Sequence, residues 1–147
     1  MRFPAIILVV ALVAACAPAE EAAEQTAQTP SGPTLADFAG TWEVMATLQG
    51  NENPVPSTMS GSADGSGWTM TLEGRPAIPM QVSIMGDSLV GQTTEYESIL
   101  RAGVMVSVRT ASVLTNGMLE GNLVATYKTP EGEEQVMGTL RASRRMN

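Results

Sequence analysis

The chain has 147 residues, a net charge of −7, a single cysteine and no histidine. This length suits one domain, and the acidic balance argues against nucleic acid as a partner, because negative charges repel phosphate backbones. Without histidine the commonest general base and metal ligand is missing, and one cysteine allows neither an internal disulfide nor a thiolate zinc site, so we expect no metal and no cofactor.

The N-terminal segment has a short basic start and then an uninterrupted apolar run over residues 4–15. A membrane-spanning helix needs about 20 residues, so this shorter run is typical of a secretion signal, residues 1–15. The run ends in Val13-Ala14-Ala15-Cys16, which resembles the lipobox of bacterial lipoproteins. The resemblance implies that Cys16 becomes the first mature residue and carries the lipid. An ordinary cleaved signal with a chance cysteine is the alternative.

The lipid implies a position for the protein in the cell. It would attach the chain to a bacterial envelope membrane, facing the periplasm, with the lipid as its link to the membrane. Ala17 follows the cysteine, where an Asp tends to retain enterobacterial lipoproteins at the inner membrane, so the outer membrane is favoured. Residues 17–33 are rich in Ala, Glu, Gln, Thr and Pro and contain no large apolar side chain. We therefore predict a flexible acidic tether over residues 16–33 and a folded domain over residues 34–147.

In the domain, apolar and polar side chains alternate with a period of two, which is typical of β-strands. Tight hairpin turns are indicated by three pairs that join a glycine to Asp or Asn: Asp64-Gly65, Gly86-Asp87 and Asn116-Gly117. A short helix or 3₁₀ turn is expected at residues 35–38, and an irregular turn over residues 97–103. The predicted strands, in chain order, are 41–48, 57–63, 67–73, 78–85, 88–96, 104–114, 118–128 and 134–144. The second has few large apolar residues, so we expect an edge or bulged strand there.

Eight consecutive hairpin-linked strands predict an all-β fold. An eight-stranded antiparallel up-and-down barrel is the simplest arrangement, because closure hides one face of the sheet and removes exposed edges. A two-sheet β-sandwich is the alternative.

The start of the first strand carries a resemblance to a known superfamily. Phe38-Ala39-Gly40-Thr41-Trp42 resembles the Gly-x-Trp opening of the calycins, which include lipocalins, fatty-acid-binding proteins and avidins. In calycins the Trp closes one end of the barrel and packs under an Arg of the last strand. The resemblance implies this role for Trp42 with Arg144, and Arg141 and Arg145 are the other candidates. The long C-terminal helix and the disulfide of lipocalins are missing.

Tyr96, Glu97 and Arg101 form the most distinctive polar cluster, at an expected mouth of the barrel. They are candidates for gripping a small polar ligand or a partner loop. The simpler alternative is an i,i+4 ion pair between Glu97 and Arg101 within a turn.

Trp68 and Arg109 are two further ligand-binding candidates. Trp68 begins a strand, where it would stack on a ligand at the barrel rim, although packing is the favoured interpretation. Arg109 lies mid-strand among valines, and an outward, solvated position is favoured. Pointing inward, it would need an anionic ligand or a buried carboxylate, for which the candidates are Glu43, Glu95 and Glu120.

Sequence patterns of catalysis are missing, since the chain has no Gly-x-Ser-x-Gly elbow and no P-loop. We expect a non-catalytic lipoprotein that binds a small apolar or amphipathic ligand in or at the mouth of the barrel. The alternative is a protein-interaction lipoprotein, an inhibitor or an envelope assembly factor. An empty cavity above about 300 Å³ would favour the ligand, and a filled interior would favour surface binding. A hydrolase with an unforeseen carboxylate dyad is a third class.

Overall fold

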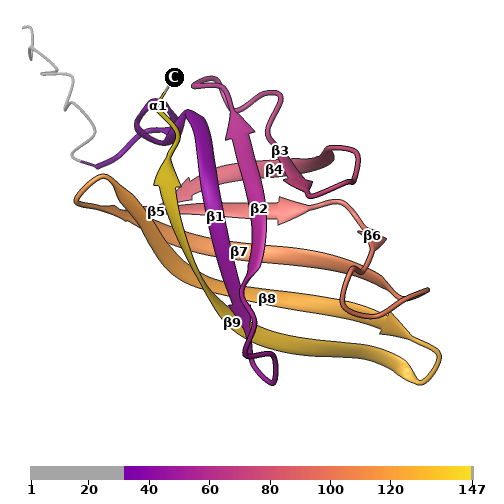
Figure 1. Ribbon diagram of the computed structural model, residues 1–147. Coiled ribbons are helices and arrows are strands. Elements are labelled where there is room, and N and C mark those ends of the chain that lie inside the picture. The colour runs from indigo at the N-terminus through magenta and orange to yellow at the C-terminus, as the bar shows by residue number, and fades with distance from the viewer. Residues whose placement is uncertain (1–31, 147) are drawn as a thin grey trace, which may run out of the picture.

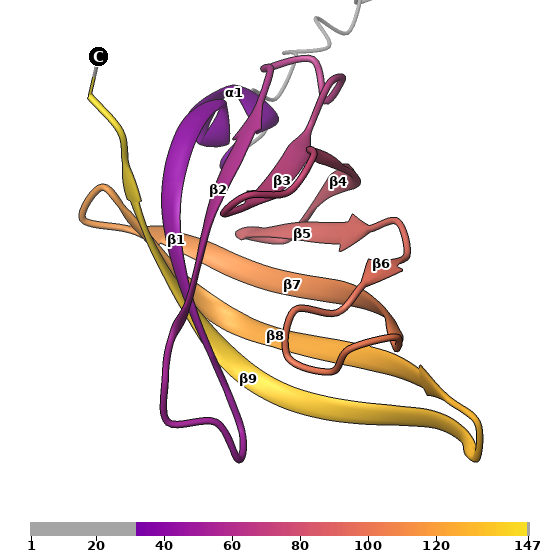
Figure 2. The same ribbon diagram turned by 45° about the vertical axis from the view of Figure 1, so that its right-hand side comes forward.

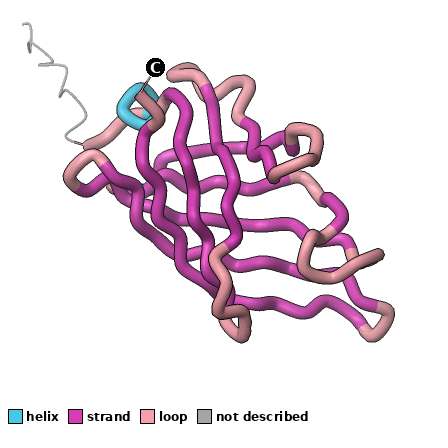
Figure 3. The backbone as a smooth tube through the Cα atoms, viewed as in Figure 1, coloured by secondary structure: helices cyan, strands magenta, loops and turns pink. Residues whose placement is uncertain are grey.

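The computed structural model describes residues 32–146, and most of them lie in antiparallel strands (Figures 1 and 3). The predicted signal, Cys16, most of the predicted tether and Asn147 lie outside the described residues. One short helix, at the predicted position, precedes the first strand. The elements are α1 (Leu35–Phe38), β1 (Gly40–Leu48), β2 (Val55–Gly61), β3 (Thr69–Leu72), β4 (Ile78–Met85), β5 (Ser88–Thr93), β6 (Tyr96–Glu97), β7 (Met105–Thr115), β8 (Met118–Thr129) and β9 (Gly132–Arg144).

The strands close into a barrel. Consecutive strands pair antiparallel from β1 to β5 and from β7 to β9, β9 pairs with β1, and β5 pairs with β7. The two-residue β6 follows β5 along the same edge of β7, so β5 and β6 together occupy one place in the wall. Figure 1 shows β1 and β2 crossing in front of β5 and β7, and in Figure 2 β7, β8 and β9 run side by side. The predicted eight-stranded up-and-down barrel is confirmed, and the sandwich alternative is wrong.

Two details of the strands differ from prediction. β2 is not an edge strand, because it pairs with β1 on one side and with β3 on the other. Its small residues have a packing role, since a Cβ at Gly61 would lie 2.1 Å from the ring of Trp68. The predicted strand 88–96 is interrupted after Thr93, whose hydroxyl accepts a hydrogen bond from the backbone N–H of Val108 (2.8 Å). The Val108 N–H therefore bonds to a side chain instead of to a backbone carbonyl of β5, and the pairing of β5 with β7 ends at Gln92 and Arg109.

The predicted hairpin at residues 116–117 shows how turn chemistry sets the strand register. Asn116 and Gly117 both have positive φ, 51° and 78°, a backbone conformation that Asn and Gly tolerate best. The turn joins β7 to β8, which then pair along their whole length.

Trp42 and the residues around it close the α1 end of the barrel. The Trp42 side chain is 0% exposed, and its indole N–H donates to the carbonyl of Phe38 (2.7 Å). The guanidinium of Arg144 lies 4.4 Å from the centre of the Trp42 ring and donates to the carbonyls of Asp37 (2.7 Å) and Ala39. This is the arrangement that the calycin resemblance implies, with the last strand, the helix and the first strand joined at one point. The other two candidate arginines pair elsewhere, Arg145 with Glu43 and Arg141 with Glu120.

The core follows the predicted alternation. Inward side chains from most strands are buried, and among them are Val44, Leu72, Ile78, Met80, Leu89, Leu119, Leu123, Leu140 and Ala142, whereas β2 contributes only partly buried residues. Among residues 32–146, no helix has the length and apolar character that crossing a bilayer requires.

Candidate functional site at the barrel mouth

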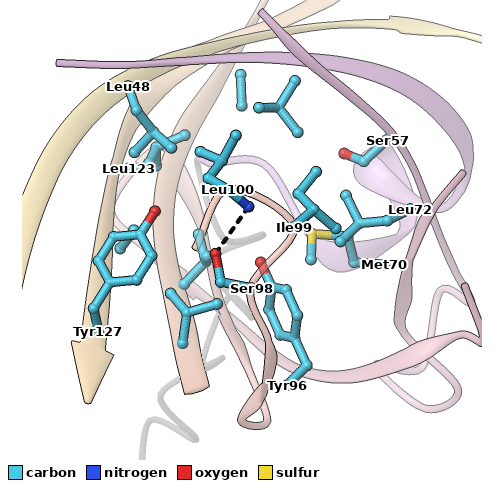
Figure 4. Close-up of a pocket in the computed structure, with 15 residues that line it drawn as sticks. Leu48, Ser57, Met70, Leu72, Tyr96, Ser98, Ile99, Leu100, Leu123 and Tyr127 are labelled. Carbon is cyan, nitrogen blue, oxygen red and sulfur yellow. Dashed lines mark hydrogen bonds between the residues drawn. The ribbon is translucent and has the colours of Figure 1, made fainter. Parts of the chain in front are cut away.

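The barrel interior holds a small apolar cavity near the end where β1 finishes (Figure 4). Its volume is about 60 Å³, room for roughly four to six water molecules. Sites for drug-sized ligands start at about 300 Å³, so the closed barrel does not enclose a ligand of that size. The lining is mostly carbon and comprises Ala46, Leu48, Val55, Ser57, Met70, Leu72, Tyr96, Ser98, Ile99, Leu100, Val106, Val108, Leu123, Ala125 and Tyr127.

A loop between β6 and β7, residues 98–103, covers this cavity; we call it the mouth loop. Ile99 and Leu100 point toward the cavity in Figure 4, yet their side chains remain 44% and 43% exposed. Ser98 is 4% exposed, and its hydroxyl oxygen accepts from the backbone N–H groups of Leu100 and Arg101, both at 3.1 Å. One buried hydroxyl therefore orders the segment that presents two large apolar side chains to the cavity.

Arg101 fastens the mouth loop to the wall. Its guanidinium donates to both carboxylate oxygens of Glu134 on β9, at 2.7 and 2.8 Å, and lies 4.2 Å from the ring centre of Tyr127. The hydrogen bond from Arg101 lowers the pKa of Glu134. Because this ion pair is solvent-exposed, it adds little to the stability of the loop. Two backbone hydrogen bonds within the segment, Ser98 N–H to the Val104 carbonyl (2.8 Å) and Val104 N–H to the Arg101 carbonyl (3.2 Å), add to this contact.

Glu97 does not form the predicted ion pair with Arg101. Its carboxylate accepts from the backbone N–H of Gly103 (3.2 Å), and its backbone carbonyl accepts from Arg75 (3.1 Å). The turn that was predicted here is present, but the i,i+4 ion pair is wrong, because the Ser98 hydroxyl orders the turn so that Arg101 reaches Glu134 on another strand.

Two tyrosines bring hydroxyl groups to the apolar cavity. Tyr127 is 3% exposed and Tyr96 is partly buried, and in Figure 4 both hydroxyls lie on the cavity side of their rings. Among the described residues, neither hydroxyl takes part in a side-chain hydrogen bond such as those that Ser98 accepts. No fully buried side-chain nitrogen or oxygen in residues 32–146 lacks a partner, so both hydroxyls are open to water. They are two free donors in apolar surroundings.

The ionisation of Tyr96 gives a test of this burial. Burial and, to a smaller extent, Tyr127 raise the pKa of Tyr96 to about 12, although Arg75 opposes the shift; the value in an unfolded chain is about 10. The unfolded state loses its proton first, so we expect the free energy of unfolding to fall as the pH rises from about 10 toward 12. Urea unfolding from pH 9 to 11.5 measures this slope.

Tyr96→Phe is the control for that slope, because it removes only the titrating hydroxyl. The pKa of Lys128 is also raised, by its hydrogen bond with Glu95. The free energy of unfolding therefore falls with rising pH from this source too, equally in the wild type and in the variant. The slope should therefore be shallower in the variant, and equal slopes would contradict the buried position of Tyr96.

The other two predicted ligand-binding residues lie away from this site. Trp68 is 2% exposed, with its indole N–H donating to the carbonyl of Ser62 (3.0 Å), so its ring is packed in the core and is not open to a ligand. It is buried there because Gly61 leaves room for its ring. Arg109 is exposed on the outer wall, beside Gln92 of β5. The three carboxylates considered for Arg109 pair instead with other cations: Glu43 with Arg145, Glu95 with Lys128 and Glu120 with Arg141.

Sequence reasoning thus found Tyr96, Glu97 and Arg101 at the mouth but missed Tyr127 and Ser98. The signal for Tyr127 was present, because Tyr127 shares the inward parity of Leu123 and Ala125 on one strand. Ser98 carries no such signal, since its importance depends on the turn that it caps.

Within residues 32–146 no group of three or more metal-ligating side chains gathers at one place. No known protein family, curated protein or solved structure matches this chain. Its function is therefore inferred from the geometry of the barrel mouth.

Proposed function

We propose that this chain is a non-catalytic, membrane-anchored lipoprotein that binds a small apolar or amphipathic molecule at the mouth of its barrel. Lipid on Cys16 would hold it on an envelope membrane facing the periplasm, the outer membrane in preference to the inner one. One observation carries the binding proposal: an apolar cavity lies beneath a loop that leaves Ile99 and Leu100 half exposed.

The ligand would take the place of these two side chains. Ile99 and Leu100 are already half in water, so moving them outward exposes little additional apolar surface. A ligand that enters removes its own methylene groups from water, each worth about 0.8 kcal/mol. Association costs several kcal/mol in lost freedom, so a ligand of about six carbons should bind weakly and exchange readily.

Filling the cavity should abolish this binding. Ala125 is buried and lines the cavity, and Ala125→Leu adds three carbon atoms to a space of about 60 Å³. We expect at least a tenfold loss of affinity for cyclohexane, measured by titration calorimetry on the full chain in nanodiscs with protein-free nanodiscs subtracted. Ala111→Leu places the same side chain on the exposed face of β7 and should leave the affinity unchanged.

Thermal unfolding of both variants verifies that they fold. If Ala125→Leu does not fold, Ala46→Leu takes its place, because Ala46 also lines the cavity. Cyclohexane binding by the wild-type chain no stronger than to empty nanodiscs would refute the proposal. So would equal binding by a folded cavity-filled variant.

A second candidate, a protein-interaction lipoprotein, is favoured by a different observation. The closed cavity is small, and methionines are exposed on the outer surface, with Met45 at 47%, Met137 at 57% and Met85 at 60%. Flexible thioethers adapt well to a protein partner. Ala125→Leu would leave such a surface intact, so retention of biological activity by that variant would favour this candidate.

A further inference from the structure

The polar groups of the cavity point to the chemistry of its ligand. Four lining residues carry hydroxyls: Ser57, Tyr96, Ser98 and Tyr127. The Ser98 oxygen is already engaged by two backbone N–H groups. Ser57 lies across the cavity beside Leu72 in Figure 4, away from the two rings. Tyr96 and Tyr127 are therefore the free donors on one side of an otherwise apolar space.

The charges around the cavity decide which acceptor fits these donors. No Asp, Glu, Lys or Arg belongs to the lining. Of the two nearby arginines, Arg101 is paired with Glu134 and Arg75 donates to the backbone carbonyl of Glu97. A carboxylate entering the cavity would lose hydration without gaining a counter-charge, which is costly. A neutral carbonyl loses far less hydration and can accept hydrogen bonds from both phenols. Tyr96 is a protonated donor at neutral pH, since the ordinary pKa of tyrosine is about 10 and burial raises that of Tyr96 to about 12.

We infer that the ligand carries a neutral carbonyl, as in an ester, which accepts hydrogen bonds from the hydroxyls of Tyr96 and Tyr127. This inference rests on the proposed binding of an apolar or amphipathic molecule at the mouth. The volume agrees, because about 60 Å³ holds roughly four to six water-sized groups, and a methyl ester group has a comparable number of heavy atoms. The alkyl part of the ligand then lies where Ile99 and Leu100 lie in the closed form.

The test compares three probes that differ in their polar group: methyl hexanoate, hexanoate and cyclohexane. Affinities are measured on the full chain in nanodiscs of ether-linked phosphatidylcholine, which contain no ester carbonyl. Tyr96→Phe and Tyr127→Phe each keep the ring and remove one donor. We expect each variant to bind methyl hexanoate about tenfold more weakly and cyclohexane unchanged, and the wild-type chain to bind hexanoate at least tenfold more weakly than its ester.

Ester-linked phosphatidylcholine nanodiscs separate two sources of the ester. Weaker binding of methyl hexanoate in those nanodiscs would identify membrane lipid as the competing ligand, and equal binding would indicate a free small ester; both outcomes keep the carbonyl inference.

Failure of the proposed function and failure of the carbonyl inference give different results. If neither cyclohexane nor methyl hexanoate binds, the proposed function falls, and the carbonyl inference falls with it. If both bind but the two phenylalanine variants bind the ester as the wild type does, or if hexanoate matches the ester, the carbonyl inference is overturned and the proposed function stands.

Discussion

Replacing Trp42 with alanine is expected to lower the free energy of unfolding by about 3–5 kcal/mol. The side chain is 0% exposed, and the cavity left at this end of the barrel would be walled by β-strands that cannot collapse around it. The variant also loses the hydrogen bond to Phe38 and the ring beneath Arg144. Urea unfolding followed by circular dichroism measures the change.

Met85→Ala is the matched control, because Met85 is a large apolar side chain that is 60% exposed. Its loss should stay within about 0.5 kcal/mol. A loss below about 1 kcal/mol for Trp42→Ala would contradict the role of Trp42 as the residue that closes this end.

The second large effect is expected at Gly61. A Cβ there would lie 2.1–2.3 Å from three ring atoms of Trp68, which is itself buried and has no space to move into. Gly61→Ala should therefore cost about 1–3 kcal/mol or more through overpacking. The fluorescence of Trp68 should change as well, because its ring must shift.

Gly91→Ala tests whether the obstruction at Gly61, and not the loss of glycine, causes the effect. Gly91 also lies within a strand at ordinary φ, but a Cβ there would meet the end of the flexible Met80 side chain (2.8 Å) and the hydroxyl oxygen of Thr110 (2.9 Å), and it would meet no aromatic ring. Its free energy of unfolding should fall by clearly less than that of Gly61→Ala. Equal losses would show that the contact with Trp68 does not matter.

The two ends of the barrel differ in how firmly they are held. The α1 end is closed by Trp42 and Arg144, with hydrogen bonds that join the helix to the first and last strands. The mouth is covered by a loop held by the Ser98 hydroxyl, by the Glu97 carboxylate and by an exposed ion pair of Arg101, and two of its large apolar side chains remain in contact with water. Such an asymmetry suits a protein that needs a rigid wall and one adjustable end.

Much of this fold was predictable because alternation and turns are local signals. The helix at Leu35–Phe38 and the strand at Ile78–Met85 have the predicted bounds, and the inward parity of β8 gave its buried residues. Arg144 was also identified as the partner of Trp42, from the calycin resemblance.

The site was less predictable because it depends on residues that meet across the barrel. Arg101 contacts Tyr127 and Glu134, which belong to strands that follow it in sequence, and no local pattern specifies these contacts. The buried position of Trp68 also depends on another strand, since the space for its ring is created by Gly61. The signal, the lipid on Cys16 and the tether remain predictions from sequence.

One titration addresses the mouth site most directly, because the only two tyrosines of the chain, Tyr96 and Tyr127, both line it. Methyl hexanoate would be added to the full chain labelled with carbon-13 at the tyrosine Cζ atoms and nitrogen-15 at the indole groups. Both tyrosine signals should shift along one saturation curve while the indole signals of Trp42 and Trp68 stay in place. Tyrosine signals that do not move at saturating ester would contradict binding at the mouth.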